Sequence, residues 1–207
     1  ETEQMLNLFL VRHGQTKWNV EKRLQGFLDS DLTELGVFQA EKLGERLSEV
    51  EFSKIYVSPR GRTLKTAELV AGKQKNEFLT DDRIQEMNFG SLEGKEIENI
   101  EYEYKIELDN MHEEPELYNP TLYGGETFES LLSRSEDFLK EVTKKDNGNV
   151  LVVAHGMSLM AIIAVIKKLK LEDYWNKGLK PNVSLTLYEF NNDSFNEKLF
   201  YDTTHYE

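Results

Sequence analysis

Apolar and polar positions follow two different periods along the chain. Three short aliphatic runs predict strands that are buried on both faces. They lie at residues 8–11, 54–57 and 150–154. Longer segments with apolar residues at helical spacing separate these strands or follow them. Those segments are residues 35–50, 59–70, 128–145 and 157–169. Because strands that alternate with helices pair in parallel, the pattern predicts an α/β fold with a mostly parallel central sheet.

Local signals predict where several of these elements begin. Thr33 precedes the first helical segment and is its predicted N-cap. Pro59 predicts the start of the second helix, because proline suits the first turn of a helix. Residues 18–30 show no regular period and predict a loop. Residues 184–190 and 195–200 alternate between apolar and polar positions, which predicts an antiparallel hairpin.

One stretch differs from the rest in composition. Residues 96–116 hold nine Asp or Glu against one Lys, with apolar residues interleaved. One interpretation is a solvated helical excursion with an acidic outer face. The other is a cap over the site, whose apolar side contributes to a substrate pocket. We expect a single domain over residues 5–207, with the cap insertion at about residues 95–125.

Charge and composition narrow the classes of function. The chain has 207 residues, a formal net charge of −13 and no cysteine. The charge argues against nucleic acid or an anionic membrane as a partner, because binding either needs clustered Lys and Arg. The lack of cysteine excludes thiol catalysis, thiolate metal sites and disulfides. No apolar run reaches the ~20 residues of a membrane span, and the acidic residues 1–4 lack the basic region of a signal peptide. We therefore expect a cytoplasmic protein.

Reactive side chains directly follow two of the predicted strands. Arg12, His13 and Gly14 follow the first strand, and His155 and Gly156 follow the third. The carboxyl ends of parallel strands meet at one edge of the sheet, where such folds bind their ligands. Arginine offers a planar fork of donors, imidazole a nucleophile or a base, and glycine leaves room for an incoming group. We expect an anion site that contains a reactive imidazole.

The turn after the second strand adds Arg60 and Arg62, at a helix start where free N–H groups favour an anion. Only one of them can readily face the site, and we expect this to be Arg62. Glu86 and Glu93, in a loop that contains glycine, are the candidate carboxylates. No metal-ligand spacing such as His-x-x-x-His accompanies these residues. Two histidines, two arginines and a glutamate together favour phosphoryl transfer without a metal.

Taken together, these residues resemble the histidine phosphatase superfamily, in its phosphoglycerate-mutase-like branch. The resemblance rests on motifs that occur in the family's order over nearly the whole chain. They are Arg12-His13-Gly14-Gln15-Thr16-x-x-Asn19, Asp31-Leu32-Thr33-x-x-Gly36, Ser58-Pro59-x-x-Arg62-x-x-x-Thr66-Ala67, Glu86-x-x-x-Gly90-x-x-Glu93-Gly94, Gly124-Gly125-Glu126-Thr127 and Ala154-His155-Gly156. The resemblance implies a three-layer αβα fold with a small helical insertion over the site.

The resemblance also implies a role for each catalytic residue. His13 is the nucleophile that becomes phosphohistidine, and Arg12, Arg62 and His155 bind the phosphoryl group. Glu86 donates a proton to the leaving alcohol and then activates the attacking water, which calls for a raised pKa. No metal and no cofactor are implied. The further phosphate contacts are Asn19, Gln25 and Gly156.

Phosphatases and mutases of this family share the phosphohistidine, so the pocket decides between them. The family's mutases follow the catalytic glutamate with Arg, His and Tyr, where this chain has Met87, Asn88 and Phe89. The insertion also lacks the paired arginines expected for a mutase. We therefore predict a phosphatase for small monoesters with an apolar or aromatic leaving group, and keep cofactor-dependent phosphoglycerate mutase as the alternative. A non-catalytic binding module on the same fold is a third hypothesis. The sequence leaves open whether the chain forms a homodimer.

Overall fold

The computed structural model describes residues 5–74, 77–175, 178 and 180–207, so the acidic residues 1–4 lie outside its described part. The strands form a mixed sheet in the order β3-β2-β4-β1-β5-β6. The first four strands in this order run parallel, and β5 and β6 add an antiparallel hairpin beside β1. The strands are β1 (Leu6–Arg12), β2 (Phe52–Val57), β3 (Phe78–Thr80), β4 (Gly148–Ala154), β5 (Leu185–Asn191) and β6 (Ser194–Asp202). The predicted α/β fold with a mostly parallel sheet is confirmed.

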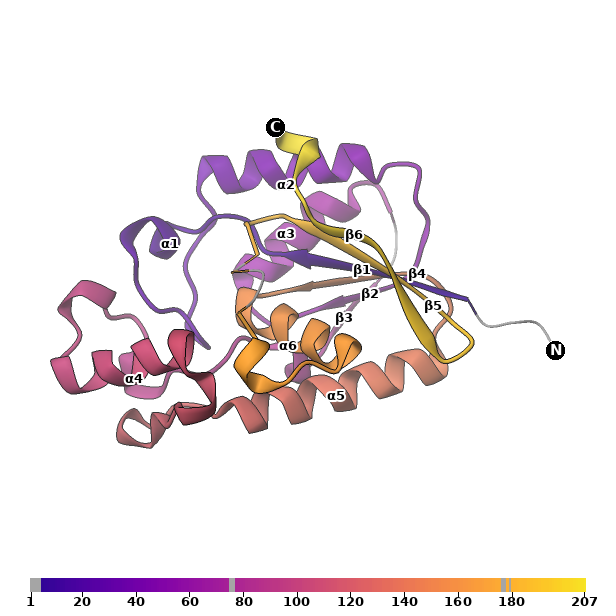
Figure 1. Cartoon of the computed structure of the whole chain (residues 1–207). Helices are drawn as coiled ribbons and strands as arrows, with labels where there is room; N and C mark the ends of the chain where they lie inside the picture. The colour runs from indigo at the N-terminus through magenta and orange to yellow at the C-terminus, as the bar shows by residue number, and fades with distance from the viewer. Residues whose placement is uncertain (1–4, 75–76, 176–177, 179) are drawn as a thin grey trace.

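Helices cover both faces of this sheet (Figure 1). The helices α2 (Glu34–Arg46) and α3 (Gly61–Ala71) lie on one face, and α5 (Phe128–Lys145) and α6 (Gly156–Lys167) lie on the other. Side chains of β1 alternate between two cores, because successive residues of a strand point to opposite faces. Leu8 and Leu10 pack with the α5 and α6 side, whereas Phe9 and Val11 pack with the α2 and α3 side. This three-layer packing holds β1 and β4 side by side, so that their carboxyl ends lie at the same edge of the sheet.

The helix starts follow the predicted signals with one exception. Thr33 caps α2, because its side chain accepts a hydrogen bond from the Gly36 N–H. The prediction that the next helix begins at Pro59 is wrong. Arg60 is the N-cap and α3 begins at Gly61, because residues 58–60 first make a tight turn in which the Arg60 N–H donates to the Ser58 carbonyl.

Two short elements were not expected from the sequence. The helix α1 (Lys17–Glu21) lies within the segment predicted as a loop, where Thr16 and Asn19 form a reciprocal capping box. The strand β3 holds three residues beside β2. The predicted loop around Glu86 also contains two 3₁₀ turns, Asp82–Ile84 and Gly90–Leu92.

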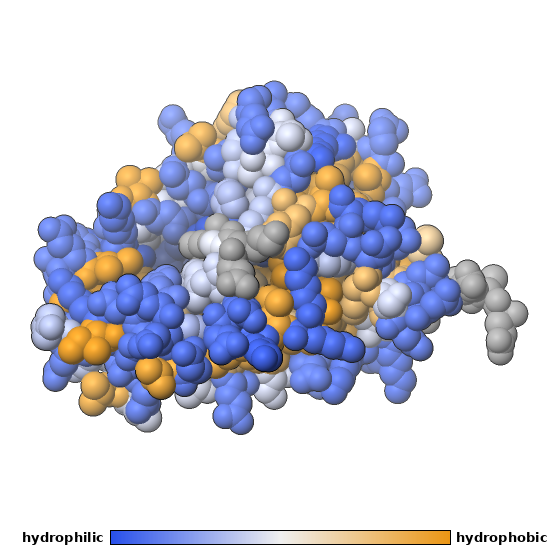
Figure 2. Space-filling model, viewed as in Figure 1, coloured by the Kyte–Doolittle hydropathy of each residue, from blue (hydrophilic) through white to orange (hydrophobic). Residues whose placement is uncertain are grey.

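The segment of residues 95–125 lies beyond the carboxyl ends of β1 and β4, at the left of Figure 1. It contains α4 (Tyr102–Glu113) and 3₁₀ turns at Ile97–Asn99, Pro115–Leu117 and Pro120–Tyr123. Leu108 and Met111 of α4 are buried in a third apolar cluster, which also takes in side chains of α5 and α6. The outer surface of this segment is mostly hydrophilic, with small apolar areas between the polar side chains (Figure 2).

Across the described residues, no helix is both long and apolar enough to cross a membrane.

Candidate active site

A pocket of about 220 Å³ opens at the carboxyl edge of the sheet. The turn after β1, the start of α6 and the segment of residues 95–125 all contribute to its walls. Seven of the predicted site residues line it, namely Arg12, His13, Asn19, Gln25, Arg62, Glu86 and Gly156. His155 lies directly behind His13, with ring centroids 5.3 Å apart. The structure thus brings together the predicted residues from five separate parts of the chain.

His13 is buried and held from several sides. Its N–H donates to the carbonyl of Ala154, at the end of the neighbouring strand β4, over 3.1 Å. Its ring Nδ1 lies 2.7 Å from the Gly14 carbonyl, which can only accept, so Nδ1 carries the proton. The other ring nitrogen, Nε2, therefore has the lone pair in the neutral ring. Burial, Arg62 and Arg12 hold the His13 pKa well below its usual value, so this ring is neutral at physiological pH.

Two guanidinium groups flank this imidazole. Arg62 is fully buried, and its terminal nitrogens donate to the carbonyls of Gly26 and Leu28 and to the Asp29 carboxylate. One terminal nitrogen of Arg12 donates to the Lys180 carbonyl. The Nε atoms of both arginines are buried without a hydrogen-bond partner among the described residues. Buried donors normally find a partner, so two unsatisfied N–H groups beside one pocket favour a bound anion.

His155 completes this cationic group from the end of β4. Its Nε2 lies 2.7 Å from the Ser58 hydroxyl, and its Nδ1 has no partner among the described residues. Burial, and then the nearby Arg62, holds the His155 pKa well below its usual value. The role of Ser58 could not be predicted, because nothing in its local sequence indicates contact with a histidine 97 residues away. The structure shows that it fixes the orientation of this ring.

Glu86 faces the start of α6. Its carboxylate accepts hydrogen bonds from the backbone N–H groups of Met87, Met157 and Ser158, over 2.9, 3.2 and 3.1 Å. The N-terminus of a helix stabilises a negative charge, and these donors lower the Glu86 pKa. Burial nevertheless has the larger effect and raises the Glu86 pKa above its usual value. A carboxyl group that holds its proton to higher pH suits a proton donor.

Two side-chain amides are fixed by their carbonyl oxygens. Asn19 Oδ1 accepts from the Thr16 N–H over 3.0 Å, and Gln25 Oε1 accepts from the hydroxyls of Thr16 and Ser30. An amide whose oxygen is anchored presents its NH₂ group in the opposite direction. Because both residues line the pocket, these NH₂ groups add donors to an anion site.

Three other residues named in the sequence analysis contribute to the structure around the pocket. Glu93 does not line the pocket; it accepts from the backbone N–H groups of Phe27 and Phe89 and so joins two loops. Arg60 lies beside Phe27 and donates to Gln85. Gly14 is needed for packing as well as for access, because a Cβ there would lie 2.8 Å from the Gly36 carbonyl.

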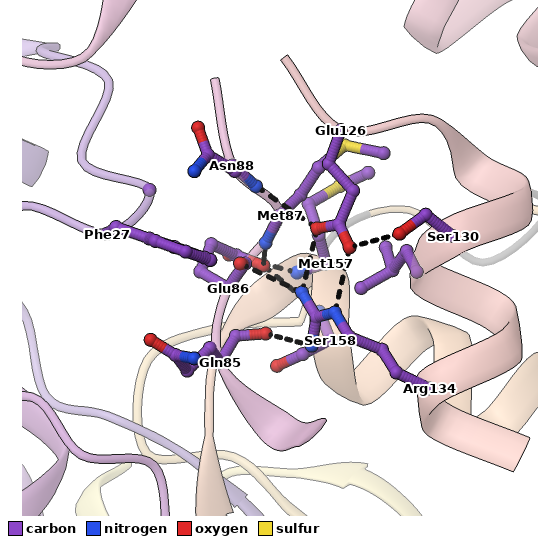
Figure 3. Close-up of polar contacts among 12 residues, drawn as sticks. Phe27, Gln85, Glu86, Met87, Asn88, Glu126, Ser130, Arg134, Met157 and Ser158 are labelled. Atoms are coloured by element: carbon purple, nitrogen blue, oxygen red, sulfur yellow. Dashed lines mark hydrogen bonds and ion pairs between the residues drawn. The ribbon is translucent and has the colours of Figure 1, made fainter. Parts of the chain in front are cut away.

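An ion pair behind Glu86 was missed by the sequence analysis (Figure 3). Arg134 of α5 donates to both carboxylate oxygens of Glu126, each over 2.8 Å. The same guanidinium donates to the backbone carbonyls of Arg83, Gln85 and Glu86. It therefore fixes the backbone that carries the Glu86 carboxyl group. No local pattern distinguishes Arg134 from the other charged residues of its helix.

Comparison with known proteins agrees with this geometry. The family model of the histidine phosphatase superfamily, branch 1, matches residues 8–203. The chain belongs to this superfamily. This confirms the resemblance seen in the sequence, and with it the expectation of a phosphatase enzyme.

Three relatives illustrate the range of this histidine phosphatase family. The chain is 35% identical over 175 residues to phosphoserine phosphatase 1 of Hydrogenobacter thermophilus. The matched region covers 84% of this chain and 82% of the relative. It is 32% identical over 191 residues to the probable phosphoglycerate mutase GpmB of Proteus mirabilis, which covers 91% and 86%. The structure of Bacillus stearothermophilus YhfR superposes with a TM-score of 0.92 at 36% identity, and covers 98% of this chain and 100% of that one.

The fixed position of Glu86 in this histidine phosphatase leads to a first prediction. If Glu86 is the proton donor, Arg134→Ala should lower kcat for alkyl phosphates about 100-fold, because displacing a reacting group by about 1 Å costs on that order. Binding of inorganic phosphate should stay close to wild type, since Arg134 contacts none of the pocket donors. Steady-state kinetics and calorimetry measure the two effects.

The control is Lys140→Ala on the same helix, whose exposed side chain pairs only with Glu136 among the described residues. Glu126→Gln weakens the same ion pair with a smaller change, and it carries the test if Arg134→Ala does not fold. An unchanged kcat, or an equal loss of phosphate binding, would contradict a positioning role.

Proposed function

We propose that this enzyme is a phosphomonoesterase that works without a metal and through a phosphohistidine at His13. One observation carries the proposal. Among the described residues, the buried Nε–H groups of Arg12 and Arg62 and the buried Nδ1 of His155 have no hydrogen-bond partner, beside an imidazole whose Nε2 lone pair is available. A phosphoryl group supplies acceptor oxygens for these donors while its phosphorus faces the imidazole nitrogen.

In the proposed first step, His13 Nε2 attacks the phosphorus and the bond to the ester oxygen breaks. Glu86, whose pKa is raised by burial, donates its proton to the departing alcohol. Arg12 and Arg62 stabilise the charge that spreads over the equatorial oxygens, as Mg²⁺ does in other phosphoryl transfers. The products of this step are a free alcohol, a phosphohistidine and an ionised Glu86.

In the second step, water attacks the phosphohistidine. The ionised Glu86 removes a proton from the water as its oxygen bonds to phosphorus, and the bond to His13 Nε2 breaks. Inorganic phosphate leaves, and His13 and the protonated Glu86 are restored. One carboxyl group therefore acts first as an acid and then as a base.

The walls of the pocket beyond the phosphate donors support an uncharged leaving group. They are largely apolar, formed by Leu24, Phe89, Ile97, Met111, Met157 and Trp175. His112 of α4 packs against Trp175 with ring centroids 4.4 Å apart, and burial lowers its pKa, so it too is neutral. This lining suits an aromatic or aliphatic group, because burying apolar surface favours binding.

A second candidate class is a substrate that carries a carboxylate. The names of the relatives from Hydrogenobacter thermophilus and Proteus mirabilis support this class, as does Arg23, a cation in the pocket wall. However, Arg23 donates through all three of its nitrogens, to Glu21, the Gly94 carbonyl and Glu96. A second anion would have to compete with these partners, so we favour the uncharged leaving group.

Mutase activity has weaker support. Met87 and Asn88 stand where mutases of the family carry Arg and His, and Met87 is fully buried. Asn88 accepts from the Gly90 N–H and so stabilises its own loop. Neither residue offers a cation to a second phosphate.

The direct test is hydrolysis of a panel of phosphomonoesters in EDTA, comparing wild type with His13→Ala. The panel runs from aryl phosphates through sugar phosphates and phosphoserine to phosphoglycerates. Turnover should survive EDTA and fall by roughly four orders of magnitude or more in the variant, because the nucleophile is lost. Acid-labile phosphorylation of the wild-type protein should appear after rapid mixing. Loss of activity in EDTA, or activity that persists in His13→Ala, would reject the mechanism.

The loss of rate on replacing Glu86 should be larger for substrates with poorer leaving groups. Glu86→Gln should slow hydrolysis of alkyl phosphates by about 10²–10⁴-fold, the usual contribution of a general acid. Hydrolysis of p-nitrophenyl phosphate, whose leaving group needs little protonation, should be much less affected. Wild-type activity on alkyl phosphates should fall as the pH rises through the Glu86 pKa, whereas the neutral His13 stays active below pH 6.5. Equal effects on both substrates would rule out proton donation by Glu86.

The selectivity of the pocket is tested by releasing Arg23. Glu96→Gln removes the negative charge of one of its partners and should raise kcat/KM for phosphoserine, relative to phenyl phosphate, by about three- to tenfold. This is the scale expected for one partly exposed ion pair. Glu98→Gln is the matched control, since it removes the same charge from an exposed neighbouring position. An identical ratio in both variants would show that Arg23 does not set the selectivity.

A further inference from the structure

Residues 180–183 form a loop behind the phosphate donors, outside every motif noted in the sequence. The side-chain Nδ2 of Asn182 donates to the His13 carbonyl over 3.0 Å and to Asn19 Oδ1 over 3.4 Å. A primary amide has two N–H groups, so one nitrogen can serve both acceptors. A single side chain thus joins the backbone of the nucleophile to the amide of a proposed phosphate ligand.

The same loop also holds Arg12. The Val183 N–H donates to the Arg12 carbonyl over 3.0 Å, and the Lys180 carbonyl accepts from the Arg12 guanidinium. Lys180 is itself held in place, because its buried Nζ lies 3.5 Å from the ring centroid of Tyr201. Contacts from one short loop therefore fix Arg12, His13 and Asn19.

The backbone of this loop is strained. Val183 has a φ of 54°, in the left-handed region that β-branched residues rarely adopt. Such a conformation is unfavourable and persists only where surrounding contacts impose it. Here the contacts come from His205 and Tyr206 near the C-terminus. The Tyr206 hydroxyl donates to the Asn182 carbonyl, and His205 Nε2 bonds the Val183 carbonyl, each over 2.8 Å.

We infer that Asn182 is a positioning residue for the proposed reaction, and that Tyr206 holds Asn182 in place. The His13 peptide is then fixed on two sides, by Ala154 through its N–H and by Asn182 through its carbonyl. The second Asn182 contact orients the Asn19 amide, so that its NH₂ group faces the pocket. This inference rests on the proposed function, because it assigns the loop a task only if His13 and Asn19 act on phosphate.

The test compares Asn182→Ala and Tyr206→Phe with wild type on the best aryl phosphate substrate. Asn182→Ala should lower kcat/KM by about 10–100-fold, the scale expected when reacting groups are displaced by part of an ångström to one ångström. It should also weaken binding of inorganic phosphate, measured by calorimetry. Tyr206→Phe, which removes one hydroxyl and keeps Asn182, should give a smaller loss in the same direction. Thr203→Ala is the control. It removes a hydroxyl beside the same C-terminal turn, and this hydroxyl donates to Glu207 rather than to the loop.

A double-mutant cycle separates positioning from general destabilisation. In an Asn19→Ala background, Asn182→Ala should cost less than in wild type, because one of its two acceptors is already gone. Strict additivity of the two substitutions, or a kcat/KM of Asn182→Ala equal to that of wild type, would overturn the inference. If Asn182→Ala does not fold, Tyr206→Phe decides: activity and phosphate affinity equal to those of Thr203→Ala would reject the role.

His13→Ala in the same assay separates failure of the proposed function from failure of the positioning role of Asn182. If wild-type turnover does not require His13, the proposed function fails, whatever Asn182 does. If turnover requires His13 and Asn182→Ala matches wild type, only the positioning role fails.

Discussion

The site depends on placing several potential cations together at one edge of a sheet. Burial lowers the pKa values of Arg12, Arg62, His13 and His155 alike, and a neighbouring arginine lowers each of them further. The fold offsets this cost in two ways. It surrounds the guanidinium groups with backbone carbonyls and the Asp29 carboxylate, and it keeps both imidazoles neutral. A bound anion would relieve this repulsion, so affinity for an anion and the electrostatic cost of placing these groups together have a common origin.

The negative charge of Glu86 is stabilised and destabilised by different parts of the fold. The chain is strongly acidic, yet the carboxylate in the pocket wall is that of Glu86, which lies on the N-terminus of α6. Helix donors stabilise its ionised form, burial stabilises its protonated form, and the two effects oppose each other within one side chain. A carboxyl group under these two opposing effects suits the alternating acid and base roles proposed for Glu86. The pair of Arg134 and Glu126 keeps this carboxyl group in place from the outer side of the loop.

Much of this arrangement could be predicted from the sequence, and the exceptions have physical reasons. The aliphatic strands, the long helix at residues 128–145 and the C-terminal hairpin follow from periodicity, because each buries a regular face. Helix α1 is too short to show a period, and its formation depends on a cap. The residues expected at the strand ends do converge, since parallel topology alone brings them together. Ser58, Arg134 and Asn182 could not be predicted, because each acts through a contact between segments far apart in the chain.

The buried amine of Lys180 makes the stability of the loop behind the pocket depend on pH. Burial lowers its pKa to about 6 in the folded chain, from an ordinary value of 10.5. Between these two values the unfolded chain binds a proton that the folded chain does not, so folding releases a proton at neutral pH. The contribution of Lys180 to stability therefore increases as the pH rises through this window, and it decreases toward pH 6. Protonation of Lys180 on acidification therefore acts on the same loop that holds Arg12 and His13, and it weakens the hold of this loop on both residues.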